Sequence, residues 1–258
     1  MATTSKLKQQ IRQGEYDAAL AALYTAEAVP AQRARYLRTI ENFEKNFGAD
    51  REVRLYSAPG RTEIGGNHTD HNNGIVMAAA VDLDIIAVVA KNDENCVRFI
   101  SEGFGKIDDI DLSILTPQAP ESEHSASLIR GVAAGIARRG GKIGGFDAFS
   151  TSDVLRGSGL SSSAAFEVCV GAIFRGEYNA ENPELLNQVE LAKIGQYAEN
   201  VFSASRPACL TRPPARSAAQ SRSISKTLPP RQSRRSSLTW PPTGSHSASA
   251  IPRAAMPI

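Results

Sequence analysis

Residues 156–167, RGSGLSSSAAFE, combine glycines and hydroxyls in a pattern suited to phosphate binding. Gly157 and Gly159 let a ligand approach the backbone closely, and the residues from Ser162 onward are typical of a helix. The first N–H groups of a helix are unpaired and its dipole is positive at that end, so this turn favours an anion. The serine hydroxyls can bond phosphate oxygens or hold magnesium. The candidate phosphate-binding residues are Gly157, Ser158, Gly159, Leu160, Ser161, Ser162 and Ser163.

The same segment excludes two common nucleotide sites. It has neither the lysine nor the G-x-x-x-x-G-K spacing of a Walker A loop, and no G-x-G-x-x-G follows a first strand. A glycine-serine linker that merely caps a helix remains the alternative interpretation.

Residues 57–74, SAPGRTEIGGNHTDHNNG, form a second polar, turn-rich segment. Carboxylate, imidazole and amide groups on one loop suit a polyhydroxylated ligand, because each sugar hydroxyl both donates and accepts hydrogen bonds. Arg61 supplies a fixed positive charge for a transferring phosphoryl group. The alternatives are that His68 and His71 are surface imidazoles, that Asp70 caps the turn, or that these three bind a metal.

Two groups of secondary-structure elements are expected to position these segments. The first fifty residues have the apolar spacing of two or three amphipathic helices. Beyond them we expect paired strands of a sheet covered on one face, followed by further helices and a strand. The expected strands are 54–61, 75–92, 96–103 and 144–153, and the expected helices are 125–139, 162–175 and one that ends at 200–202.

Composition places the chain among globular proteins of the cytoplasm. Its 258 residues are 41% hydrophobic, its start is too charged for a signal peptide, and no stretch approaches the roughly 18 apolar residues of a membrane span. We therefore expect no membrane partner. Cys96, Cys169 and Cys209 match neither a disulfide framework nor a zinc site and are expected to be reduced thiols.

Charge divides the chain near residue 200. The last acidic residue is Glu199, and nine of the 29 Lys and Arg residues follow it, together with nine of the 14 prolines. Such a segment has too few apolar residues to offset the entropy of ordering, so we expect residues 203–258 to be disordered. A basic tail that binds nucleic acid would need interleaved aromatics, and Trp240 is the tail's one aromatic residue. We expect no nucleic-acid partner.

Together the two polar segments resemble the GHMP kinases, and within them the galactokinases. The family motif A-P-G-R-x-N-x-I-G-E-H-x-D-Y is similar to APGRTEIGGNHTDH at residues 58–71, and G-x-G-L-S-S-S-A is complete at 157–164. The resemblance covers about residues 50–202. It implies a mixed α/β (α+β) fold: a GHMP-kinase N-terminal domain at 51–202, preceded by a helical extension at 1–50, with the C-terminal domain missing.

The resemblance also implies roles for individual residues. Arg61 corresponds to the family's transition-state arginine, and Asn67, His68 and Asp70 to ligands of the sugar, galactose. ATP phosphates would lie against 157–163, with Mg²⁺ on Ser163 and Glu167. The sequence departs from the motif at two positions, because Asn67 replaces a glutamate and His71 a tyrosine. The oligomeric state stays open.

One catalytic group of the family is missing. The family uses an aspartate in a G-L-x-D-Q segment soon after the second motif as proton acceptor, and here no aspartate follows Asp153. Codons exist for residues 203–228 that, regrouped one base earlier, read FGKPSGLLDQTACAVGGAVAIDFEDP. We therefore predict that the reading frame slips near Phe202 and that the chain is a truncated, inactive relative of galactokinase. The alternatives are a kinase for another small alcohol and a non-catalytic sugar and ATP sensor.

Overall fold

The computed structural model describes residues 2–65, 77–104, 109–121, 124–154 and 159–203. The elements follow one another as β1 (Ala2–Thr3), α1 (Thr4–Gln13), α2 (Asp17–Leu23), α3 (Val29–Phe47), β2 (Glu52–Gly65), β3 (Met77–Lys91), β4 (Cys96–Ser101), β5 (Ile110–Asp111), a short 3₁₀ helix (Ala119–Glu121), α4 (Ser125–Ala137), β6 (Phe146–Ser152), α5 (Ser162–Tyr178) and α6 (Gln188–Phe202). The predicted mixed α/β fold is confirmed, and each predicted helix and strand is present with ends shifted by a few residues. The predicted disorder of 203–258 concerns residues that, apart from Ser203, lie outside the described ones.

Local sequence explains where several helices begin and end. The Thr3 side chain accepts a hydrogen bond from the Lys6 N–H at the start of α1, and Asn187 does the same for two N–H groups of α6. Gly14 ends α1 at a φ of 82°, a left-handed conformation that favours glycine. These caps fix the ends of helices that the apolar pattern alone leaves uncertain.

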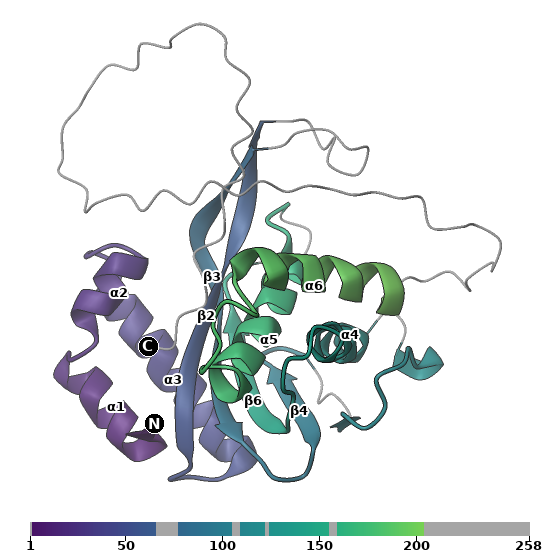
Figure 1. Cartoon of the computed structure of the whole chain (residues 1–258). Coiled ribbons are helices and arrows are strands. Elements are labelled where there is room, and N and C mark those ends of the chain that lie inside the picture. Colours follow the sequence, from purple (N-terminus) through teal and green to yellow (C-terminus); the bar gives the residue numbers. More distant parts are fainter. Residues whose placement is uncertain (1, 66–76, 105–108, 122–123, 155–158, 204–258) are drawn as a thin grey trace, which may run out of the picture.

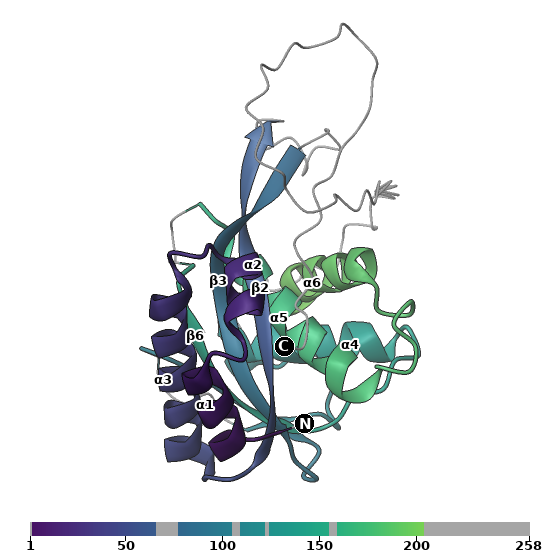
Figure 2. The same ribbon diagram turned by 90° about the vertical axis from the view of Figure 1, so that its left-hand side faces the viewer.

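The sheet is the central layer of the molecule (Figure 1). Its strands lie in the order β1-β2-β3-β6-β4-β5. The β2–β3 and β3–β6 pairs are antiparallel, whereas β4 and β6 run parallel. The long pair β2 and β3 projects beyond the helices, as both views show (Figures 1 and 2). Arg61 lies on β2.

Helices cover both faces of the sheet, so the expectation of one covered face is wrong. Along β3, Ile85, Ala87 and Val89 pack into the core under α4, α5 and α6. The alternate residues Ile86, Val88 and Ala90 pack into a second core with the N-terminal helices. A continuous apolar run is typical of a strand buried on both faces, and the apolar sides of α1 and α3 supply the second cover. Figure 2 shows α1 and α3 against the face opposite α4 and α6.

Three smaller observations complete the fold. Cys96 and Cys169 are buried free thiols, as predicted, and Cys209 lies outside the described residues. Within the described ranges, no helix is both long and apolar enough to cross a membrane. The same ranges contain no cluster of three or more His, Cys, Asp or Glu residues arranged to hold a metal ion.

Candidate active site

The candidate phosphate-binding turn, residues 157–163, leads into helix α5 at Ser162, as predicted. Gly159 has a φ of 76°, and Ser161 is itself left-handed with a φ of 56°. The Ser161 side chain makes no capping hydrogen bond with α5, although its carbonyl accepts the Ala165 N–H. Ser161 thus leaves the first N–H groups of α5 without a cap from its own side chain, which suits an anion site. Gly157 and Ser158 lie outside the described residues.

A backbone hydrogen bond joins this turn to strand β2. The Arg61 N–H donates to the carbonyl of Leu160 at 3.1 Å. Gly60 makes the approach possible, because a Cβ there would lie 3.2 Å from the same carbonyl and 3.2 Å from Val154 Cγ2. Both contacts are tighter than side chains normally tolerate. The described parts of the two polar segments therefore converge, as phosphoryl transfer between them would require.

The sugar-binding candidates fall on the loop after β2. Arg61 is half-buried on β2 and pairs with Ala80 of β3. Asn67, His68 and Asp70 lie outside the described residues, as does His71. Their predicted role as sugar ligands stays a prediction.

Two glutamates lie beside the phosphate-binding turn, and one of them was not predicted. Ser163 Oγ donates to Glu199 Oε1 of helix α6 at 3.3 Å. Glu167 is one turn along α5 from Ser163, and only 3% of it is exposed. Gly195 makes room for it, because a Cβ at that position would lie 2.8 Å from Glu167 Oε2.

Glu167 is in an environment that disfavours its charge. Its Oε1 is buried and has no hydrogen-bond partner among the described residues. Burial, with a further contribution from the Glu199 carboxylate, raises the pKa of Glu167 to about 8. Glu199 is the more accessible carboxylate and contacts a serine of the turn, so Ser163 and Glu199 offer the better pair of oxygen ligands for a cation.

No sequence motif marks Glu199. It belongs to α6, 36 residues after Ser163, and the two meet only because α5 and α6 pack together. The available signal was Gly195, a glycine inside a helical pattern and one turn before Glu199, which indicates a close contact at that face.

Comparison with known proteins gives two family matches. Residues 127–209 match the family described as GHMP kinases N terminal domain, from α4 through α6 and a few residues beyond. Residues 41–91 match the Galactokinase galactose-binding signature, which spans β2 and β3. The two matches enclose the two polar segments of the sequence.

Two solved structures are similar to this chain. A galactokinase from Lactococcus lactis, crystallised with galactose, is 28% identical, with a TM-score of 0.58 over 66% of this chain and 42% of that one. A mevalonate kinase from Methanococcus jannaschii is 17% identical, with a TM-score of 0.47 over 58% of this chain and 46% of that one. This chain spans less than half the length of either protein.

The family matches and the fold agree on the class of protein that this chain resembles: residues 127–209 match the N-terminal domain of the GHMP kinases. Within that class, residues 41–91 match the galactokinase signature, and the chain is similar to the Lactococcus lactis galactokinase. The resemblance predicted from the two sequence motifs is confirmed.

Proposed function

We propose that this chain provides the ATP-binding and galactose-binding half of a galactokinase, which transfers a phosphoryl group from MgATP to the anomeric hydroxyl of galactose. The family matches, and the galactose bound to the Lactococcus lactis protein, support the choice of sugar. The departures from the motif at Asn67 and His71 support the alternative within the class, a kinase for another small alcohol.

The hydrogen bond between the Arg61 N–H and the Leu160 carbonyl is the observation that carries the proposal. A kinase must place the acceptor hydroxyl about 3–3.5 Å from the transferring phosphorus. The two segments are about a hundred residues apart in sequence, and their backbones touch at this point. Ligands on the two segments would therefore be neighbours.

Each group has a role that its chemistry allows. The N–H groups at the start of α5 would bind ATP phosphates, and Arg61 would stabilise the charge that develops during transfer. Ser163 with Glu199 would hold Mg²⁺, which would supply positive charge to neutralise that of the phosphates. Asn67, His68 and Asp70 would bind sugar hydroxyls. Glu167 is more buried and would support the turn from behind.

We further propose that the 258-residue chain binds both ligands without turnover. No aspartate follows Asp153, so the residue that would accept the hydroxyl proton is absent from the position where the family has it. This proposal includes the frame slip near Phe202, with an N-terminal helical part at 1–50, a kinase-like domain at 51–202 and an out-of-frame segment at 203–258.

Calorimetric titration of the purified chain tests the binding proposal. Galactose and a non-hydrolysable ATP analogue with Mg²⁺ should each bind, whereas glucose, which differs at one hydroxyl, should bind much more weakly. Binding of the nucleotide with no response to galactose would favour another small-molecule kinase. Failure to bind either ligand would contradict the proposed function.

A further inference from the structure

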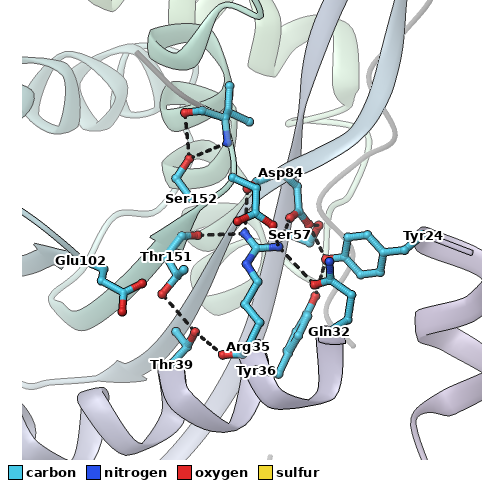
Figure 3. A network of polar contacts seen from close by, with 12 residues as sticks. Tyr24, Gln32, Arg35, Tyr36, Thr39, Ser57, Asp84, Glu102, Thr151 and Ser152 are labelled. Carbon is cyan, nitrogen blue, oxygen red and sulfur yellow. Dashed lines mark hydrogen bonds and ion pairs between the residues drawn. The ribbon is translucent and has the colours of Figure 1, made fainter. Parts of the chain in front are cut away.

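A buried arginine connects the N-terminal helices to the strands behind the candidate active site (Figure 3). Arg35 of α3 is only 5% exposed. Its Nη1 donates to Asp84 Oδ1 at 2.7 Å, and its Nη2 donates to the carbonyls of Asp84 at 2.8 Å and Thr151 at 3.2 Å. Arg35 also pairs with Asp153 at 2.9 Å. One guanidinium thus bridges β3 and the end of β6.

Asp84 extends these contacts to strand β2 and helix α2. Its Oδ2 accepts a hydrogen bond from Ser57 Oγ of β2 and another, at 2.6 Å, from the hydroxyl of Tyr24, just after α2. Its carbonyl accepts the Asp153 N–H at 2.9 Å. We call this set the Arg35 network, and its members are Tyr24, Arg35, Ser57, Asp84, Thr151 and Asp153.

The network lies directly behind both polar segments. Asp84 pairs with Pro59, and the β2–β3 register then shifts between Pro59 and Arg61. On the other side, Asp153 is followed by Val154, whose side chain touches the Gly60 position. The strand that carries Arg61 thus bonds to Asp84 through Ser57. The segment before the candidate phosphate-binding turn bonds to Asp84 and Arg35 through Asp153.

Stability alone does not require such a network. The N-terminal helices already bury an apolar core against the sheet. A buried ion pair adds little net stability over apolar residues of similar volume, because both charges lose their hydration. What a forked guanidinium adds is fixed geometry, since its donors are held in one plane.

We infer that Arg35 is a positioning residue: through Asp84 and the Thr151 carbonyl, it sets the separation between Arg61 and the phosphate-binding turn. This role matters for catalysis only if the proposed function holds, so the inference rests on that function. The separation itself can be measured without any ligand. The Arg61 N–H that bonds to Leu160 reports directly on that separation.

The test is amide hydrogen exchange in Arg35→Lys, with Arg130→Lys as the matched control. Lysine keeps the charge but cannot form the fork. Arg130 is 4% exposed and likewise bonds one carboxylate, Glu121, and two backbone carbonyls. Unlike Asp84, which bonds to Ser57 and pairs with Pro59, these partners have no hydrogen bond to a described residue of either polar segment. Both variants are expected to lower overall stability to a similar degree.

We expect Arg35→Lys to raise the exchange rate of the Arg61 amide about tenfold relative to amides of the central strand, such as that of Val88. In Arg130→Lys, the exchange rate of the Arg61 amide should not rise relative to that of Val88. Asp84→Asn is a second variant for the case in which Arg35→Lys does not fold; it keeps the side-chain shape, and Asp153 still pairs with Arg35. The same selective increase is expected there.

Two results would overturn the inference: an Arg61 amide that exchanges in step with Val88 in Arg35→Lys and Asp84→Asn, or the same selective increase in Arg130→Lys. Ligand titrations of the unaltered chain separate this outcome from a failure of the proposed function. If the unaltered chain binds both ligands but the variants show no selective increase in exchange of the Arg61 amide, the positioning role is wrong and the proposed function stands.

Discussion

At the scale of single residues, the proposed phosphate-binding role of the turn at 157–163 depends on backbone conformation more than on charged side chains. Gly159 is left-handed, at a φ of 76°, and a Cβ added there would meet none of the described atoms within 4 Å. Gly159→Val should therefore strain the turn without a steric clash. Because a left-handed β-branched residue costs roughly 1–2 kcal/mol, we expect about tenfold weaker binding of the ATP analogue in a calorimetric titration.

Gly140→Val is the control for this change. Gly140 has a φ of 77° and equally open surroundings, but it lies after α4, outside both polar segments. It should cost similar stability and leave nucleotide affinity unchanged. Equal affinities of the two variants for the nucleotide would argue against a phosphate role for the turn.

The second residue-scale prediction concerns Glu167. Its pKa of about 8 in the folded chain lies above the ordinary value of 4.5, so its neutral form contributes stability that is fully present below about pH 4.5 and is lost as pH rises through about 8. Glu167→Gln mimics the neutral form. The free energy of unfolding of the variant, relative to that of the parent chain, should therefore increase between about pH 5 and pH 8. Denaturant titrations at both pH values measure this, and a pH-independent difference would contradict the assigned environment.

The sequence predicted the residues of the site better than their contacts. Gly159 and Ser162 follow from turn chemistry and helix-start signals, which are local properties of the chain. The hydrogen bond between Ser163 and Glu199 joins residues 36 positions apart, and that between Arg35 and Asp84 joins residues 49 positions apart. No spacing rule relates such pairs, because they depend on how whole helices pack.

At the scale of elements, helix α6, which carries Glu199, packs closely against α4. Gly131 of α4 faces α6 so closely that a Cβ there would lie 2.7 Å from Ala198 Cβ and 2.8 Å from Ala198 Cα. Gly131→Ala should therefore push the helices apart and lower the free energy of unfolding by about 1–3 kcal/mol, the usual cost of overpacking. Denaturant unfolding measures the change.

Gly171→Ala is the matched control in helix α5. A Cβ there would meet Leu191 Cδ2 at 2.9 Å, the end of a flexible side chain that can move. Alanine is also the better helix former by about 1 kcal/mol. We expect little loss of stability or a small gain, and equal losses in the two variants would contradict the close α4–α6 contact.

Strand β3 shows how far element prediction reached. Its existence and approximate ends follow from the apolar run at 75–92, but the number of covered faces was predicted wrongly. Ile85 to Ala90 alternate between two cores although all six residues are apolar. The amphipathic N-terminal helices were predicted. Which surface they cover depends on tertiary packing, and the sequence of the helices alone does not determine it.

At the scale of the whole molecule, the chain combines a three-layer body with a segment of different composition. Residues 1–200 contain all 27 acidic side chains, and the later residues contain none. The GHMP-kinase match ends at residue 209, a few residues into this segment. The proposed frame slip near Phe202 would account for the change in composition and for the missing aspartate together.

Galactose phosphorylation by two purified proteins tests the central claim most directly. One is the present 258-residue chain, and the other is the product of a gene in which the reading frame is restored near codon 202 by one inserted or deleted base. We predict turnover by the frame-restored protein and none by the present chain, because only the former regains an aspartate to accept the hydroxyl proton. Robust phosphorylation of galactose by the 258-residue chain would contradict the account, since the proton acceptor would then have to be a residue already present.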